Sequence, residues 1–230
     1  MRLTRTGCVA SGAYLVLGLV WVAVAHPPGS SWPEVGWVAV VALAGLFVPG
    51  LANQVSLARA YLAAPALAYA STPGDLGLLA VTVAVAGVTD LVDGTIARRT
   101  QAVSRFGGGL DPVVDGVFVG AVGLGLTIGG AIPAWLAGVA LARYLLPALV
   151  GGALVLAGRR VDFRHTLTGQ VSTVLILVLL GGVALLRGLD QDPGNYVLGA
   201  EVVIPIATVA TFVHLGFALR RRPAAGAADA

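Results

Sequence analysis

The sequence contains no lysine, because all 14 basic residues of the 230-residue chain are arginine. A lysine nucleophile or a Schiff-base lysine is therefore excluded. The single cysteine, Cys8, cannot form an intramolecular disulfide. Charged residues of both signs are scarce, at 11% of the chain, whereas 57% of the residues are apolar. A soluble domain of this length could not bury so much apolar surface, so the composition predicts a polytopic membrane protein.

Turn-forming residues divide the chain into eight apolar segments. The segments cover residues 8–25, 35–50, 52–71, 75–98, 107–129, 131–157, 168–187 and 196–219. A membrane-spanning helix needs about 20 mostly apolar residues. We therefore predict an all-α polytopic membrane protein with eight membrane segments, of which 35–50 is short for a span.

The arginines in the loops and tails lie almost entirely on one side of this predicted topology. Eleven share that side: Arg2, Arg5, Arg98, Arg99, Arg105, Arg159, Arg160, Arg164, Arg220, Arg221 and Arg222. Arg187 borders the opposite side, next to Asp190 and Asp192. Because basic loops remain in the cytoplasm, we expect both termini to be cytoplasmic and the protein to lie in a bacterial cytoplasmic membrane.

The first apolar segment also fits a second interpretation. Arg2 and Arg5 precede an apolar run that ends in Ala23-Val24-Ala25, an order typical of a cleavable signal peptide. Cleavage would leave the predicted topology of the following segments unchanged.

Four aspartates lie in or between two neighbouring apolar segments, where a carboxylate at membrane depth costs about 2.5–3.5 kcal/mol. Asp90 and Asp93 are spaced i and i+3, and Asp111 and Asp115 i and i+4, so each pair shares a helix face. Two antiparallel helices would bring the four carboxylates together. Two magnesium-like ions, which usually keep open positions for a substrate's phosphates, would compensate their charge. The pattern therefore predicts metal-assisted phosphoryl transfer in a membrane.

The residues around these aspartates resemble the signature of the CDP-alcohol phosphatidyltransferase family, D-x2-D-G-x2-A-R-x8-G-x3-D-x3-D. Every specified position matches: Asp90, Asp93, Gly94, Ala97, Arg98, Gly107, Asp111 and Asp115. Upstream, Asn53, Ser56 and Arg59 resemble the family's N-x2-[S/T]-x2-R opening. The resemblance covers residues 52–219 and leaves 1–51 as an N-terminal apolar extension and 220–230 as a cytoplasmic tail.

This resemblance implies a six-helix core, here with two extra N-terminal apolar segments, that forms a homodimer with a polar cavity facing the cytoplasm. It implies transfer of a phosphatidyl group from CDP-diacylglycerol to an alcohol, with release of CMP and no role for nucleic acid. Two Mg²⁺ or Mn²⁺ ions are implied, one held by Asp90, Asp93 and Asp111 and the other by Asp90, Asp111 and Asp115. Asp115 would also be the general base.

The resemblance assigns further residues to the two substrates. Gly94, Ala97 and Gly107 would give access to the cytidine, and the pyrophosphate would be held by Arg98, Asn53 and Ser56. Candidates for the acceptor side of the cavity are Arg59, Arg105 and Arg143. Of these, Arg143 lies in the middle of segment 131–157, where a long side chain cannot easily reach the interface.

Glycerol 3-phosphate is the expected acceptor, and phosphatidylglycerol and inositol phosphate are the alternatives. Asp111-Pro112 and Ala142-Arg143 resemble the phosphatidylglycerophosphate and cardiolipin synthase branch. Two positions depart from that branch: Tyr144 replaces a glutamate, and Gly116 stands where a lysine often follows the last aspartate.

Two functions outside this family also use clustered aspartates in a membrane. An aspartate-rich membrane prenyltransferase would lack the glycine, alanine and arginine positions of this signature. A cation transporter commonly contains broken helices or repeats, and the sequence shows no convincing repeat.

Overall fold

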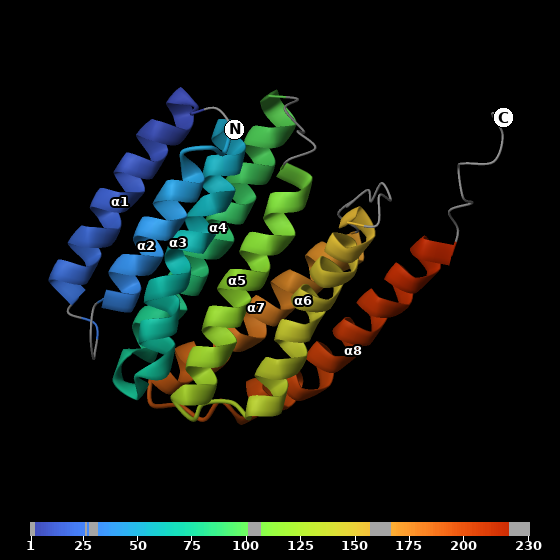
Figure 1. Cartoon of the computed structure of the whole chain (residues 1–230). Helices are drawn as coiled ribbons and strands as arrows, with labels where there is room; N and C mark the ends of the chain where they lie inside the picture. Colours follow the sequence, from blue (N-terminus) through green and yellow to red (C-terminus); the bar gives the residue numbers. More distant parts are fainter. Residues whose placement is uncertain (1–2, 26, 28–31, 101–106, 157–166, 221–230) are drawn as a thin grey trace, which may run out of the picture.

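The computed structural model of the chain describes residues 3–25, 27, 32–100, 107–156 and 167–220, and these residues form eight α-helices and one 3₁₀ turn, Pro73–Asp75 (Figure 1). The helices are α1 (Arg5–Ala25), α2 (Trp32–Gly45), α3 (Leu51–Ser71), α4 (Leu76–Thr100), α5 (Gly107–Ile128), α6 (Ala134–Leu156), α7 (Leu167–Gly188) and α8 (Gly194–Arg220). The described residues contain no strand. The predicted all-α class is therefore confirmed.

Five helices of the described part of the chain are long and apolar enough to cross a membrane: α1, α4, α5, α7 and α8. The apolar helix α2 and the apolar part of α6, Ala134–Pro147, are shorter. Helix α3 is long but carries Asn53, Gln54 and Arg59 in its first half. The chain is thus a multi-pass membrane protein, and the full count of eight spans stays a prediction.

The predicted boundary that differs most from the structure is the end of segment 35–50. The helix in this segment, α2, ends at Gly45. Beyond it the chain turns, with the Val48 amide donating to the Gly45 carbonyl at 3.1 Å. Pro49 has no amide hydrogen, and Gly50 has a φ of 87°, a left-handed conformation that favours glycine. These two residues redirect the chain into α3.

Helix α3 lies at the centre of one half of the bundle, in contact with α1, α2, α4 and α5 (Figure 1). Helix α7 packs on α4, α6 packs on α5, and α8 contacts both α6 and α7. Lipid chains are as apolar as leucine, so close packing of small residues holds such helices together. A Cβ at Gly125 of α5 would overlap that of Ala70 and stand 2.9 Å from the Leu67 carbonyl oxygen of α3.

Tryptophan side chains attach the two N-terminal helices to α3. The indole NH of Trp37 in α2 donates to the Ala60 carbonyl at 2.7 Å, and that of Trp21 in α1 donates to the Tyr69 hydroxyl at 2.6 Å. The Gln54 amide of α3, which is 1% exposed, donates at 2.8 Å to the carbonyl of Gly45, the last residue of α2, and at 2.7 Å to that of Val48 in the following turn. These contacts fix the position and rotation of α3.

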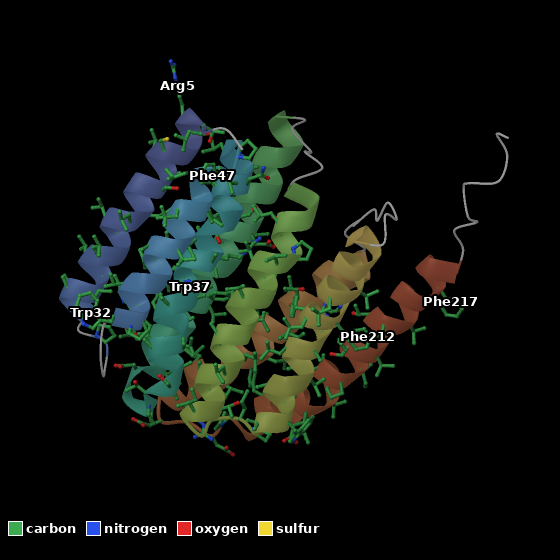
Figure 2. All side chains as sticks on the ribbon, in the orientation of Figure 1. Arg5, Trp32, Trp37, Phe47, Phe212 and Phe217 are labelled. Carbon is green, nitrogen blue, oxygen red and sulfur yellow. The ribbon has the colours of Figure 1, made fainter. Side chains whose placement is uncertain are left out.

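The distribution of side chains is that of a membrane protein. Large apolar residues face outward along the outer helices, as Phe217 of α8 does with 56% of its surface exposed (Figure 2), whereas most of α3 is buried. Two arginines lie inside the bundle instead: Arg59 is 2% exposed and Arg143 is 4% exposed. A buried arginine is costly unless polar groups surround it, so these two residues indicate where the functional groups gather.

We expect Gly125→Ala to destabilise the protein by about 1–3 kcal/mol, because the added methyl group separates α5 from the α3 backbone. Thermal unfolding in detergent measures the effect. The matched control is Gly138→Ala in α6, where an added Cβ meets no atom within 4 Å. Equal unfolding temperatures for both variants would contradict the close contact.

Candidate active site

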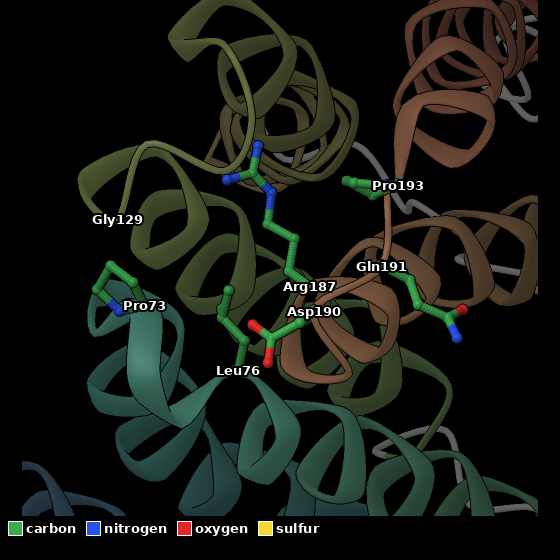
Figure 3. A pocket seen from close by; sticks show the side chains of 7 residues that line it. All are labelled: Pro73, Leu76, Gly129, Arg187, Asp190, Gln191 and Pro193. Carbon is green, nitrogen blue, oxygen red and sulfur yellow. The ribbon is translucent and has the colours of Figure 1, made fainter.

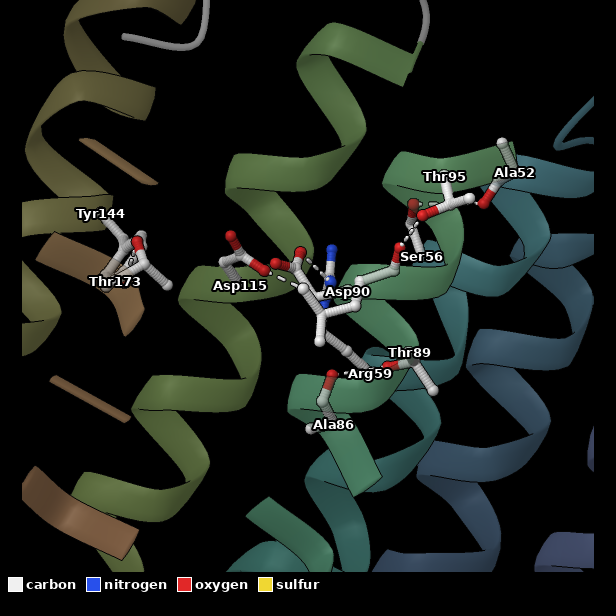
Figure 4. A network of polar contacts seen from close by, with 11 residues as sticks. Ala52, Ser56, Arg59, Ala86, Thr89, Asp90, Thr95, Asp115, Tyr144 and Thr173 are labelled. Carbon is white, nitrogen blue, oxygen red and sulfur yellow. Dashed lines mark hydrogen bonds and ion pairs between the residues drawn. The ribbon is translucent and has the colours of Figure 1, made fainter. Parts of the chain in front are cut away.

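A buried arginine joins two of the predicted aspartates (Figure 4). Arg59 Nε of α3 lies 3.0 Å from Asp115 Oδ1 of α5, and Arg59 Nη1 donates to Asp90 Oδ1 of α4. The three side chains differ in exposure, at 2% for Arg59, 14% for Asp115 and 50% for Asp90. A single guanidinium group therefore spans two carboxylates that belong to two different helices.

This arrangement follows from local geometry. Arg59 lies on the third turn of α3, and the planar guanidinium group offers donors in a fixed fork that can serve two carboxylates at once. Burying the charge of Arg59 requires such partners, because an unpaired buried charge is strongly destabilising. The polar cluster thus reaches the surface at Asp90 and is buried in the bundle at Arg59.

The other predicted metal ligands lie beside this pair in the chain. Asp111 precedes Asp115 by one turn of α5 and is partly exposed. The side chain of Asp93 lies outside the described residues. Among the described side chains, no three acidic, histidine or cysteine groups form a metal site. Because Asp93 is one of the four predicted ligands, the two-metal site stays a prediction.

The predicted nucleotide residues lie on α3, α4 and α5. The Asn53 amide donates to the Pro49 carbonyl at 2.6 Å, and the Ser56 hydroxyl donates to the Ala52 carbonyl at 3.2 Å. Ser56 precedes Arg59 by three residues and so shares its helix face. Gly94 lies one turn beyond Asp90 on α4, and Gly107 begins α5. The side chains of Ala97 and Arg98, and the whole of Arg105, lie outside the described residues.

Arg143 forms a second polar group with residues that the sequence did not indicate. Its Nε donates to Thr211 Oγ1 of α8 at 3.4 Å, and its Nη2 donates to Thr173 Oγ1 of α7 at 3.5 Å. These distances exceed the usual 2.7–3.2 Å of such bonds. The Tyr144 hydroxyl donates to Thr173 Oγ1 at 3.1 Å. No motif marks the two threonines, and only an inward position in an apolar helix could have suggested them.

A separate cavity of about 320 Å³ lies at the other end of α4 and α5 (Figure 3). Its lining includes Pro73, Leu76, Gly129, Arg187 and Asp190. These residues belong to the turn before α4, the end of α5 and the turn after α7. The predicted aspartates do not line it, so this cavity is not the predicted site.

Comparison with known proteins identifies the family. Residues 50–219 match the CDP-alcohol phosphatidyltransferase family. This match covers most of the chain and includes the aspartates and Arg59. The chain therefore belongs to the CDP-alcohol phosphatidyltransferase family.

The proteins similar to this chain include cardiolipin synthases and phosphatidylglycerophosphate synthases. A probable cardiolipin synthase (CMP-forming) of Drosophila melanogaster is 33% identical, over 58% of this chain and 44% of its own length. A CDP-diacylglycerol–glycerol-3-phosphate 3-phosphatidyltransferase of Bacillus subtilis is 30% identical, over 59% of this chain and 76% of its length. A probable phosphatidylglycerophosphate synthase of Mycobacterium tuberculosis is 28% identical, over 56% and 61% respectively. No solved structure shows significant similarity to this chain.

We expect Arg59→Leu to lower the thermal stability of the protein in detergent. Removing one partner of a fully buried ion pair costs about 3–5 kcal/mol, and the loss here should be smaller because Asp90 is half exposed. The unfolding temperature of Arg59→Lys should lie between those of the wild type and Arg59→Leu, since an ammonium group lacks the fork that reaches both carboxylates. An Arg59→Leu protein that unfolds at the wild-type temperature would show that the bridge does not stabilise the fold.

Proposed function

We propose that this protein transfers a phosphatidyl group from CDP-diacylglycerol to the hydroxyl group of glycerol 3-phosphate and releases CMP. Membership of the family supports the reaction class. The Bacillus relative, whose name includes glycerol 3-phosphate, supports the choice of acceptor. The observation that carries the proposal is the approach of Asp90 and Asp115 from two helices to one shared cationic group.

The residues present suit divalent cations. Carboxylate oxygens are the ligands that Mg²⁺ and Mn²⁺ prefer, and the contacts of Arg59 indicate that one positive group can reach Asp90 and Asp115 together. In this proposal Asp90, Asp93, Asp111 and Asp115 hold two Mg²⁺ or Mn²⁺ ions. When bound, these ions would neutralise the diphosphate of the donor and the charge that develops on CMP.

The proposed reaction is a single displacement at the phosphorus atom that carries the diacylglycerol. The acceptor hydroxyl loses its proton to an Asp115 carboxylate oxygen as its own oxygen bonds to phosphorus. The bond from phosphorus to the bridging oxygen breaks, and its electron pair leaves on CMP. Arg98, Asn53 and Ser56 hold the nucleotide end of the donor, beside the small residues Gly94, Ala97 and Gly107.

The acceptor's phosphate is assigned to Arg143. This guanidinium group is 4% exposed, and its described hydrogen bonds to Thr211 and Thr173 are long and involve neutral hydroxyl groups. An anionic ligand would give a stronger, charge-assisted bond. Arg59 and Arg105 remain further candidates for the acceptor side of the cavity.

The proposed enzyme works in phospholipid biosynthesis, as a homodimer in a bacterial cytoplasmic membrane. The helix ends that adjoin the arginine-rich segments, at the start of α1 and the ends of α4, α6 and α8, lie on one side of the bundle (Figure 1). The positive-inside tendency places that side in the cytoplasm. The aspartates lie in the half of α4 and α5 nearest to it, where soluble substrates would enter.

A second acceptor is phosphatidylglycerol, favoured by the name of the Drosophila relative. Purified protein incubated with CDP-diacylglycerol and Mg²⁺ or Mn²⁺ separates the two, with glycerol 3-phosphate, phosphatidylglycerol and inositol phosphate as acceptors. CMP release and the lipid product are measured. We expect glycerol 3-phosphate to give the highest kcat/KM, and preferential formation of cardiolipin would select the second acceptor.

Asp115→Asn should reduce CMP release by about 10²–10⁴-fold, the usual contribution of a general base. Stabilisation of the protein by CMP with Mn²⁺ should partly survive, because the other three aspartates remain. Asp190→Asn, in the turn after α7, serves as a matched control and should keep wild-type turnover. Turnover near the wild-type value in Asp115→Asn would remove this residue from the role of base.

Arg143→Ala should raise the KM for glycerol 3-phosphate about 10- to 100-fold, which corresponds to a charge-assisted bond of roughly 1.5–3 kcal/mol. The KM for CDP-diacylglycerol should change little. Arg187→Ala, at the opposite end of the bundle, is the control for loss of one positive charge. Equal increases in both KM values would assign Arg143 to the fold or to the donor site.

A further inference from the structure

The residue that follows the proposed base is in unusually close contact with α6. A Cβ added to Gly116 would stand 2.8 Å from the Cβ of Tyr144 and 3.1 Å from its Cγ. The Cβ position of Tyr144 is fixed by its backbone, so this atom could move away only if the α6 backbone moved. The absence of a side chain at position 116 therefore allows α6 to approach α5 directly beside Asp115.

The Tyr144 side chain is held on its other sides as well. The Arg143 guanidinium carbon lies 5.2 Å from the centroid of the Tyr144 ring, within the range of a cation–π contact. The Tyr144 hydroxyl donates to Thr173 of α7 at 3.1 Å, and Thr173 also accepts from Arg143. The Tyr144 side chain thus contacts both Gly116, next to Asp115, and the polar group of Arg143.

We propose that Tyr144 is a positioning residue that sets the separation between the Asp115 carboxylate and the Arg143 guanidinium group. This inference rests on the proposed function, in which the acceptor's hydroxyl meets Asp115 and its phosphate meets Arg143. The ring then acts as a rigid spacer that selects small polyol phosphates of matching length. The donor does not depend on this spacing, because none of its proposed contacts involves Arg143.

A spacer can be distinguished from a residue that only fills space. General loosening of the bundle would lower stability and turnover and would affect both substrates. A changed separation between Asp115 and Arg143 would weaken the binding of the acceptor alone, because only the acceptor must reach both groups. The ratio of the two KM values therefore tests the proposal, whereas stability does not.

The experiment compares two glycines of α5 that both face α6. Gly116→Ala forces the contact with Tyr144 apart, whereas a Cβ at Gly120 would meet only Leu141 side-chain atoms, at 3.4 and 3.7 Å, which is ordinary contact. Tyr144→Leu removes the ring without disturbing position 116, and Tyr144→Phe keeps the ring but removes the hydroxyl group. KM values for glycerol 3-phosphate and CDP-diacylglycerol are measured for each variant and the wild type.

We expect Gly116→Ala and Tyr144→Leu to raise the KM for glycerol 3-phosphate about tenfold or more, the effect of weakening one charge-assisted bond. The KM for CDP-diacylglycerol should stay within about twofold in both variants, a small difference in binding free energy. Gly120→Ala should resemble the wild type in both values. Tyr144→Phe keeps the ring but loses the hydrogen bond to Thr173, so it should raise the KM for glycerol 3-phosphate less than Tyr144→Leu does. If Gly116→Ala does not fold, Tyr144→Leu decides alone.

Two negative results of this experiment would have different meanings. If the wild type turns over glycerol 3-phosphate but Tyr144→Leu changes both KM values equally or neither, the spacer role is wrong and the proposed function stands. If the wild type forms no CMP with glycerol 3-phosphate, the proposed acceptor is wrong, and the inference falls with it.

Discussion

The bridge from Arg59 to Asp90 and Asp115 is the interaction on which the rest of the structure depends. Three charged groups from three helices meet here, and the most deeply buried of them, Arg59, would not be stable inside the bundle without its carboxylate partners. Their meeting requires α3, α4 and α5 to lie side by side at one depth and in one rotation. Much of the remaining structure, including the two N-terminal helices, can be understood as holding α3 in that place.

Helix α3 is held in place by the kinds of interaction that are effective inside a membrane. Apolar side chains gain little by leaving lipid for the protein interior, so close backbone packing and hydrogen bonds must hold the helices together. Gly125 of α5 lets the backbone of α3 approach, and Trp21 and Trp37 donate hydrogen bonds to α3 from α1 and α2. A second glycine acts in the same way beside the proposed base, where Gly116 lets α6 approach α5. Close helix packing therefore occurs directly next to the proposed active site.

The two departures from the related synthases acquire one explanation in the structure. Gly116 and Tyr144 are 28 positions apart in sequence, and each considered alone only weakens the resemblance. In space the two residues touch, and a side chain at one position would exclude the other from its place. The pair is thus a single structural feature on the acceptor side of the proposed site. The names of the relatives likewise differ, one being a cardiolipin synthase and another a glycerol-3-phosphate phosphatidyltransferase.

The membrane class, the eight helical segments and the aspartate pattern can be predicted from the sequence, because each rests on local periodicity or on fixed spacing within one or two helices. The end of α2 at Gly45 cannot, because apolar composition continues through the turn. The contacts of Arg59 with Asp90 and Asp115, of Arg143 with Thr173 and Thr211, and of Tyr144 with Gly116 are visible in the folded structure alone. Those contacts join residues from different helices, and their formation depends on helix rotation and depth, which no spacing along a single chain encodes.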